Sequence, residues 1–419
     1  MPQAVQFFRS VPRWLMVRGL ASSWPSVATG ALSCIELKDL PAPALPSPEW
    51  VRVKTRLSGV CGSDLSAIAC KGSPYFSPFV STPFVLGHEL VGTIEETGSA
   101  VPPHWSRGMR VVVEPALCCQ VRGISPPCKP CSLGHYAHCE NILKGTIKGG
   151  IQTGYCNSTG GGWSEAGVVV HHSQLYAVPE KLSDDEAVLA EPLACAVHAA
   201  LKAPMDAKST LLVLGAGSIG LMLIFAYRAA GGKARILVSA RYKHQAEMAM
   251  KLGASEIFSG RGSEALYGWV LERSGVAENG KAGIHRPEIG KPVLLGGTDA
   301  VFDCVGSSES IDDSMRLTRP RGTLVLVGMP GIPKGVDWTS VWYKEITVQG
   351  AYAYGWEEVG GARVKTMQLA LDYLAASKGA LKPLVNRRYK LSEYRSALES
   401  AFNAGRSGAF KTVFEVSQA

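Results

Sequence analysis

Four side chains have the types and local contexts of ligands for a catalytic metal ion. Cys61 is followed by Gly-Ser-Asp, the pair His88 and Glu89 follows a glycine, and Glu191 precedes a proline much later in the chain. A catalytic zinc takes three protein ligands of these kinds and keeps one position open for water or substrate. Each residue alone is more often a packed thiol or a solvated polar group. Together they predict a zinc site assembled from distant segments.

Three further cysteines are spaced for a second, structural metal site. Cys128 and Cys131 form a Cys-x-x-Cys motif, and Cys139 follows in the same segment. Closely spaced thiols of this kind suit a four-coordinate zinc that is closed to solvent. The alternative, three reduced thiols without a metal, is disfavoured by the spacing.

A glycine-rich segment predicts a nucleotide site. The motif Gly-Ala-Gly-Ser-Ile-Gly follows a short apolar stretch and opens a helical one. Its glycines permit a tight turn and let a pyrophosphate approach the helix N-terminus. We therefore expect five residues to contact a dinucleotide: Gly215, Gly217, Ser218, Ile219 and Gly220.

The end of the following strand predicts which dinucleotide binds. An acidic residue there would bind the ribose hydroxyls of NAD, but residues 238–244 contain none. A small residue followed by Arg241 leaves room for a 2′-phosphate and supplies a planar cation to hold it. We therefore favour NADP; if Arg241 only faces solvent, NAD is the alternative.

The elements that must position these residues change in type near Glu191. Before it, alternating or valine-rich segments predict half-buried β-strands at 50–57, 111–113 and 168–170. After it, strands alternate with helices, with strands at 211–214, 236–238, 300–305 and 323–327 and helices at 218–230 and 242–252. This order predicts an α/β chain in which a β-rich region precedes a doubly wound parallel sheet. Near the C-terminus we expect helices at 362–376 and 393–403 and a strand at 410–416.

Three segments allow two interpretations. Residues 1–31 contain three arginines and no acid, as in an organellar transit peptide, but we favour two strands, at 5–8 and 15–17. The uncharged run 209–227 is long enough to span a bilayer, yet its glycines favour a buried strand followed by a buried helix. Residues 259–298, rich in glycine, proline and charge, predict an elaborated connection without an assigned role.

Length and composition limit the class of protein. At 419 residues the chain is longer than one hydrophobic core normally serves, which predicts two domains. The net charge of +8 is spread along the chain without runs of like charge, so we expect neither a nucleic-acid nor a membrane patch. Eleven cysteines without a secretory leader favour reduced thiols over a disulfide scaffold, and hence a cytoplasmic protein.

These motifs, in this order, resemble those of the zinc-containing medium-chain alcohol dehydrogenases. The sequence Glu-Pro-Leu-Ala at Glu191 is similar to the polyol, sugar and threonine dehydrogenase branch. The resemblance implies a GroES-like catalytic domain in residues 1–193, a Rossmann domain in 194–354 and a return to the catalytic domain in 355–419. It also implies a set of catalytic zinc ligands: Cys61 and His88, completed by Glu89 and Glu191, with Cys195 as an alternative.

The resemblance further assigns roles around both metal sites. In the family, the first of four lobe cysteines would fall at Ser125. We therefore assign the structural zinc to Cys119, Cys128, Cys131 and Cys139, with Cys118 as the alternative to Cys119. Ser63 resembles the hydroxyl that passes on the substrate proton, and Asp64 resembles a supporting group. Ser66 stands where many relatives have a histidine of the proton relay.

The implied activity is hydride transfer between an alcohol or polyol hydroxyl and NAD(P) at a zinc ion. The nicotinamide should lie by Val305 and Gly328, at the carboxyl ends of later strands. The loop 75–79 and Trp163 are candidates for the wall of the substrate pocket. We expect a homodimer or homotetramer. The alternatives are a zinc-free quinone or enoyl reductase, which lacks these motifs, and a non-catalytic NADPH-binding protein, which has no need for an open zinc.

Overall fold

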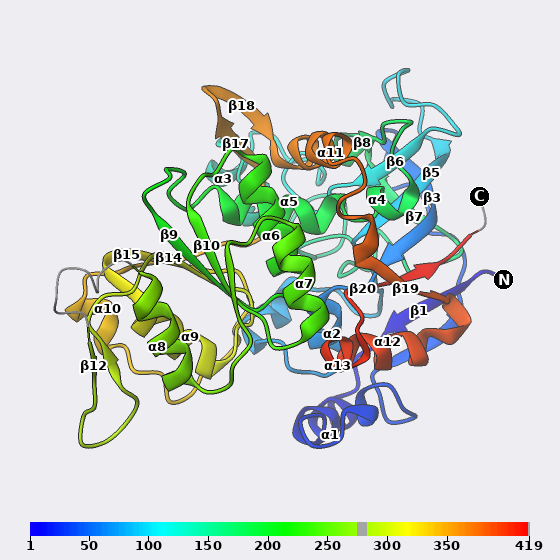
Figure 1. Ribbon diagram of the computed structural model, residues 1–419. Coiled ribbons are helices and arrows are strands. Elements are labelled where there is room, and N and C mark those ends of the chain that lie inside the picture. The colour runs from blue at the N-terminus through cyan, green and yellow to red at the C-terminus, as the bar shows by residue number, and fades with distance from the viewer. Residues whose placement is uncertain (275–282, 418–419) are drawn as a thin grey trace. The chain divides into compact units, whose positions relative to one another are not determined.

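Two compact units make up the chain in a computed structural model, which describes residues 1–274 and 283–417 (Figure 1). The first unit comprises residues 1–194 and 354–419, and the second comprises residues 195–353. The chain thus leaves the first unit once, completes the second, and returns.

A largely antiparallel sheet is the framework of the first unit. β3 (Trp50–Gly59) lies at its centre and pairs with β5 (Leu90–Thr97), β7 (Val168–His171) and β20 (Lys411–Glu415). The predicted alternation along β3 is confirmed, since Val53 and Thr55 are buried while Lys54 between them is exposed. The remaining strands are β6 (Arg110–Val113), β8 (Leu175–Ala177) and β19 (Val385–Lys390).

A small second sheet leads the chain to His88. β1 (Gln3–Phe7) pairs with β2 (Ile35–Asp39) and β4 (Phe84–Val85), which confirms the strand predicted at 5–8. The rings of Phe7 and Phe84 stack with centroids 5.1 Å apart. β4 is therefore fixed immediately before the segment that carries the candidate ligands.

The strand predicted at 15–17 is wrong. These residues lie in the helix α1 (Val11–Leu20), in which Pro12 occupies the first turn. A proline is tolerated there because the N–H groups of the first turn have no partner within the helix. Pro12 therefore begins a helix and does not separate two strands.

Short helices connect the strands of the first unit. They are α2 (Gly62–Ile68), α3 (Lys129–Ser132), α4 (Asp184–Ala187), η1 (Pro25–Ala28), η2 (Pro74–Phe79), η3 (Tyr136–His138) and η4 (His172–Gln174). The helix α5 (Ala190–Ala200) contains the passage to the second unit.

The returning segment differs from expectation at one end. Residues 362–365 are not helical but form β18 (Ala362–Lys365), because they pair with β17 (Trp356–Val359) in a hairpin. The predicted helix begins only after it, as α11 (Thr366–Ala376). The last helix and strand are confirmed, and the elements of this part are η6 (Lys382–Leu384), η7 (Leu391–Glu393), α12 (Tyr394–Phe402) and α13 (Ala404–Ser407).

A six-stranded sheet with parallel neighbours is the core of the second unit. Its strand order is β11-β10-β9-β14-β15-β16, which in order along the chain is the 3-2-1-4-5-6 arrangement of a Rossmann fold. The strands are β9 (Thr210–Leu214), β10 (Arg235–Ser239), β11 (Glu256–Phe258), β14 (Thr298–Asp303), β15 (Thr318–Leu326) and β16 (Thr347–Gly350). The helices are α6 (Ser218–Ala229), α7 (Lys243–Lys251), α8 (Ser263–Arg273), α9 (Ser308–Leu317) and α10 (Thr339–Tyr343).

The run 209–227 is a buried strand followed by a mostly buried helix, as predicted. Among the described residues, no helix combines the length and the apolar composition needed to cross a membrane. The connection predicted at 259–298 contains α8 and a hairpin of β12 (Ile284–His285) with β13 (Val293–Leu294). Residues 275–282 of that connection lie outside the described part.

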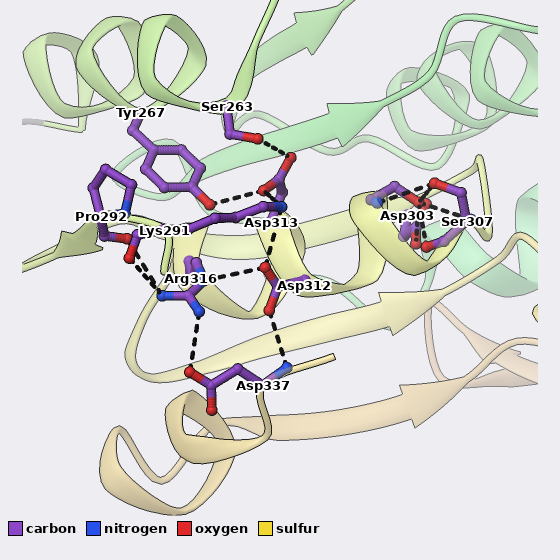
Figure 2. Close-up of polar contacts among 11 residues, drawn as sticks. Ser263, Tyr267, Lys291, Pro292, Asp303, Ser307, Asp312, Asp313, Arg316 and Asp337 are labelled. Atoms are coloured by element: carbon purple, nitrogen blue, oxygen red, sulfur yellow. Dashed lines mark hydrogen bonds and ion pairs between the residues drawn. The ribbon is translucent and has the colours of Figure 1, made fainter. Parts of the chain in front are cut away.

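A polar network fastens the hairpin to α9 (Figure 2). The Nζ atom of Lys291 lies 3.1 Å from Asp312 Oδ2 and 2.6 Å from Asp313 Oδ1. Arg316 lies 3.3 Å from Asp312 and 3.0 Å from Asp337, so it joins α9 to the segment before α10. Since every charged group in the network has an opposite charge beside it, we interpret the network as structural.

Candidate metal and nucleotide sites

The ligand atoms of Cys61, His88 and Glu89 lie within 4.8 Å of one another in the first unit. Cys61 caps the N-terminus of α2, whereas His88 and Glu89 directly precede β5. His88 and Glu89 are buried, but Cys61 is only partly buried. A thiol, an imidazole and a carboxylate thus converge where one side stays accessible, which is the donor set of a catalytic zinc.

Two glycines make room for this arrangement. Gly87 has φ +93°, and a Cβ atom on it would lie 2.3 Å from Cδ1 of Trp163. A Cβ atom on Gly59 would lie 2.1 Å from Glu89 Oε2. Trp163 is fully buried and its Nε1–H donates to the carbonyl oxygen of Gly59 at 3.1 Å. The expectation that Trp163 lines the pocket is therefore wrong, because it packs in the core beneath the ligands.

Asp64 lies beside two of the ligands. Its Oδ2 accepts the backbone N–H of Cys61 at 2.9 Å, and its Oδ1 lies 3.5 Å from Nδ1 of His88. A carboxylate on one ring nitrogen leaves Nε2 of His88 as the metal-binding atom. The Oγ of Ser63 lies 3.5 Å from that same Nε2, so the hydroxyl lies next to the position a metal would take.

The residues present fit a zinc ion. Burial lowers the pKa of His88, but the charges of Asp64 and Cys61 raise it well above its ordinary value overall, which shows that the site favours positive charge. The Oε1 atom of Glu89 is buried without a hydrogen-bond partner in the described structure. A buried carboxylate oxygen without a donor is costly unless a cation or water satisfies it.

Lys411 is a site residue that the sequence analysis missed. It lies at the start of β20, is 4 % exposed, and forms an ion pair with Oε2 of Glu89. Although burial lowers it, the negative charges of Glu89, Cys61 and Glu191 raise the pKa of Lys411 above its ordinary value. The sequence did contain a signal for Lys411, since a lysine is unusual within the mostly apolar strand predicted at 410–416.

Glu191 is not one of the three clustered ligands. It lies in the first turn of α5, is 7 % exposed, and acts electrostatically on Lys411. Its ligand atoms and the thiol of Cys195 are not part of the group formed by Cys61, His88 and Glu89. Direct ligation by Glu191 therefore stays a prediction.

The four thiols assigned to structural zinc converge in the same unit. The Sγ atoms of Cys119, Cys128, Cys131 and Cys139 all lie within 4.8 Å of one another. Sγ of Cys139 is 3.6 Å from Cys119 and 4.0 Å from Cys128. A zinc with Zn–S bonds of about 2.3 Å gives tetrahedral S–S edges of about 3.8 Å, so these distances fit a bound ion.

Neighbouring N–H groups donate to three of the four sulfurs. Backbone N–H groups of Cys128, Glu140 and Asn141 donate to the sulfurs of Cys119, Cys128 and Cys139 respectively. A hydrogen bond from the thiol of Cys131 is the main cause that lowers the pKa of Cys139, to about 5, and the Asn141 N–H adds to it. Burial opposes this change. The alternative Cys118 is not part of the four-thiol group.

Arg122 holds the lobe together and was also missed. Its side chain is fully buried, and its N–H groups donate to five carbonyl oxygens. These acceptors are the carbonyls of Leu117, Lys144, Ile147, Lys148 and Gly150. The guanidinium thus replaces secondary structure in an irregular loop that must keep four thiols in place.

The glycines of the nucleotide motif serve different purposes. Gly215 has φ +94°, and a Cβ atom on Gly220 would lie 2.0 Å from the carbonyl oxygen of Gly215. A Cβ atom on Gly217, by contrast, would meet nothing within 4 Å. Gly215 and Gly220 are therefore required by the turn, whereas Gly217 leaves open space before Ser218 and Ile219 at the start of α6. The first N–H groups of a helix bind phosphate.

Arg241 lies just beyond β10, is exposed, and places its guanidinium 6.0 Å from the centre of the Tyr242 ring. Such stacking keeps a planar cation at the strand end. Val305 is 54 % exposed, and a Cβ atom on Gly328 would lie 2.5 Å from the N atom of Gly306. The two loops predicted to contact the nicotinamide are thus in direct contact with each other.

A buried carboxylate shapes the first of these loops. Oδ1 of Asp303 accepts the N–H groups of Val305 and Gly306 at 2.9 and 3.0 Å, and Oδ2 accepts the Ser310 hydroxyl at 3.0 Å. Burial raises the pKa of Asp303 although these bonds oppose the change. The loop that would face the nucleotide is therefore held by a side chain the sequence analysis did not select.

The loop 75–79 forms η2, in which Tyr75 is 73 % exposed. It is a surface segment. Ser66, in place of a relay histidine, is partly buried on α2.

Fold and sites together define a two-domain, zinc-binding, nicotinamide-dependent dehydrogenase, and comparison with known proteins agrees. Residues 47–180 match the alcohol dehydrogenase GroES-like domain family, and residues 218–368 match the zinc-binding dehydrogenase family. The chain is 30% identical over 380 residues to a sorbitol dehydrogenase of Arabidopsis thaliana, covering 89% of this chain and 90% of the relative. It is 29% identical over 377 residues to an L-idonate 5-dehydrogenase of Vitis vinifera, with 89% and 90% covered.

A solved structure has the same architecture. The NADP-bound crystal structure of a putative zinc-binding dehydrogenase from Sinorhizobium meliloti superposes with a TM-score of 0.67 at 25% identity, covering 91% of this chain and 96% of that one. The chain belongs to the zinc-containing medium-chain dehydrogenase family, in the branch that includes these polyol dehydrogenases. It is a zinc-dependent oxidoreductase that acts on an alcohol with a nicotinamide cofactor.

Proposed function

We propose that this chain oxidises a secondary hydroxyl of a polyol or sugar acid, or reduces the matching ketone, with NADP. The observation that carries the proposal is the convergence of Cys61, His88 and Glu89 with the hydroxyl of Ser63 beside His88 Nε2. The relatives named for sorbitol and L-idonate support this substrate class.

In this proposal the residues of the site divide the work. Cys61 and His88 hold the zinc, with Glu89 and Glu191 as further carboxylate ligands, and a bound zinc polarises the substrate oxygen. Ser63 would accept the proton of the substrate hydroxyl, while the carbon that bears this hydroxyl gives its hydride to the nicotinamide. Asp64 keeps His88 oriented through Nδ1. Because Ser66 replaces a relay histidine, the proton leaves Ser63 by a route that does not use an imidazole at that position.

The nucleotide-binding unit supplies the cofactor's other contacts. Its pyrophosphate binds at Gly217 and the first N–H groups of α6, and its nicotinamide lies against Val305 and Gly328. Arg241 binds the 2′-phosphate, because no acidic side chain at the end of β10 competes for the ribose. These contacts make NADP the preferred cofactor.

We further propose a cytoplasmic homodimer or homotetramer. The aromatic residues Trp338, Trp342 and Tyr343, at and just before α10, are each more than half exposed. They support burial against another copy of the chain, since such clusters are uncommon on free surfaces. The eleven cysteines all lie in the described residues and none forms a disulfide, which supports a reducing compartment.

Activity assays on purified, zinc-loaded protein test the proposal. We expect oxidation of sorbitol or L-idonate with NADP⁺, or reduction of the matching ketones with NADPH, faster than any reaction with short alcohols. Ser63→Ala should lower kcat by roughly 10²–10⁴ while NADPH binding is kept, and Ser66→Ala serves as the matched control with a small effect. NADPH binding without turnover of any alcohol or ketone would instead support a protein that only binds the nucleotide.

A further inference from the structure

The helix α1 exposes an apolar face. Its exposed residues are Val11, Pro12, Leu15, Met16, Gly19 and Leu20, none of which is charged. At about 100° per residue these positions fall on one half of the helix. The exposure is not limited to a frayed helix end, because Leu15 in the middle of α1 is 60 % exposed.

The charged residues of α1 are on its other half and are engaged there. Arg13 donates to the carbonyl oxygen of Ser33 at 3.2 Å, and Arg18 donates to those of Cys70 and Gly72 at 2.7 and 3.2 Å. Val17 between them is buried. The protein therefore uses its cations to fasten the helix and turns the apolar side outward, which is the reverse of an ordinary surface helix.

Aromatic residues extend the apolar face at both borders. Trp24, after the end of α1, is 65 % exposed. Tyr75 and Phe76 of η2 are 73 % and 42 % exposed, and they come shortly after Gly72, whose carbonyl oxygen accepts from Arg18. α1 lies at the outer edge of the first unit (Figure 1). Trp and Tyr beside aliphatic residues are the composition of a segment that lies in a membrane interface.

Charge favours an anionic partner. The first 35 residues contain Arg9, Arg13 and Arg18 and no acid; Glu36 is the first. Arg9, two residues before the start of α1, is exposed. The nearby acids Glu36 and Glu393 line a groove together with two arginines, so the border of the face is not acidic overall.

Size argues against a second protein as the occupant. A stable interface uses roughly 20–30 residues on each side, whereas this face offers one helix and its aromatic borders. A lipid surface requires only an apolar helix face with cations beside it. Against the expectation from the charge distribution that the chain has no membrane patch, we propose that α1, Trp24 and η2 form a site by which the first unit rests on anionic membrane surfaces without crossing them.

Vesicle sedimentation with the full-length, zinc-loaded protein tests the proposal. We expect binding to vesicles of equal parts phosphatidylcholine and phosphatidylglycerol, and weak binding to phosphatidylcholine alone. The double variant Leu15→Gln with Leu20→Gln should bind the anionic vesicles about tenfold less or weaker still. Arg9→Glu should weaken binding severalfold without removing apolar area.

Matched controls make each outcome decisive. Ile289→Gln with Leu295→Gln, which changes two exposed aliphatic residues of the second unit, should leave vesicle binding unchanged. All variants should keep the unfolding midpoint and dehydrogenase rate of the parent chain. Absent binding to anionic vesicles, or equal binding by the α1 variant, would overturn the proposal. A dimer that the α1 variant dissociates, without vesicle binding, would identify a second copy as the occupant instead.

Discussion

Lys411 and Glu89 form an ion pair that is almost entirely shielded from solvent. Glu89 comes from the segment before β5, whereas Lys411 comes from β20, which the chain adds only after completing the second unit. The pair therefore couples the candidate metal site to the returning end of the chain. Gly59 makes the contact possible, since its missing side chain leaves the space that the pair occupies.

Removing one partner of this pair should be strongly destabilising. Lys411→Met leaves the carboxylate of Glu89 buried without a counter-charge, and we expect a loss of about 3–5 kcal/mol in the free energy of unfolding. Chemical denaturation of the zinc-free protein measures it. Pairing Lys411→Met with Glu89→Gln should restore much of the loss, and a double variant no better than the single one would contradict the coupling.

Two neighbouring cysteines should differ in their importance for the structural zinc. Cys119→Ser should reduce the zinc content from two ions to one and lower the unfolding midpoint by about 5 °C or more, because a structural zinc contributes to folding. Cys118→Ser is the matched control and should keep both ions, since its thiol lies outside the four-thiol group. Native mass spectrometry counts the ions; the reverse pattern would move the site to Cys118.

Local motifs made the Rossmann fold and the group of four thiols predictable, because strand-glycine-helix order and short cysteine spacing constrain structure within one segment. The residues that were missed depend on contacts between segments. Lys411 meets Glu89 only after the chain has returned, and the carbonyl oxygens that Arg122 binds acquire their positions from the folded loop. Similarly, Pro12 is compatible with a strand break or a helix start, and only the contacts of Val17 and Arg18 with the rest of the unit decide between them.

Arg241 should determine the choice between nucleotides. We expect Arg241→Ala to raise the KM for NADP by roughly 10–100-fold, because a charge-assisted contact to the 2′-phosphate is lost. The KM for NAD should change little, which provides an internal control in the same variant. Equal losses for both nucleotides would assign Arg241 to the fold rather than to the phosphate.

Asp303 should act on nucleotide binding through the loop it holds. Asp303→Ala removes the acceptor of the Val305 and Gly306 N–H groups, and we expect the Kd for NADPH to rise by roughly tenfold. Ser310→Ala removes one bond at the other oxygen and should have a smaller effect. Isothermal titration gives both values, and unchanged zinc content would confine the defect to the second unit. An unchanged Kd in Asp303→Ala would mean that the loop keeps its shape without the carboxylate.

Lys344 should give the second unit a distinct pH dependence. Its Nζ is buried and donates to the carbonyl oxygens of Arg316 and Thr318, and burial lowers its pKa to about 8, with Arg316 adding to the effect. Between that value and the ordinary lysine pKa of 10.5, the unfolded chain binds a proton that the folded chain has released. This difference makes the contribution of Lys344 to stability rise with pH across that window.

Lys344→Met abolishes the contribution, so the stability of the parent chain relative to this variant should increase by about 1–3 kcal/mol from pH 8 to pH 10. Denaturant titrations of both proteins measure the difference, and a gap that stays constant over this range would show that the buried ammonium keeps its proton.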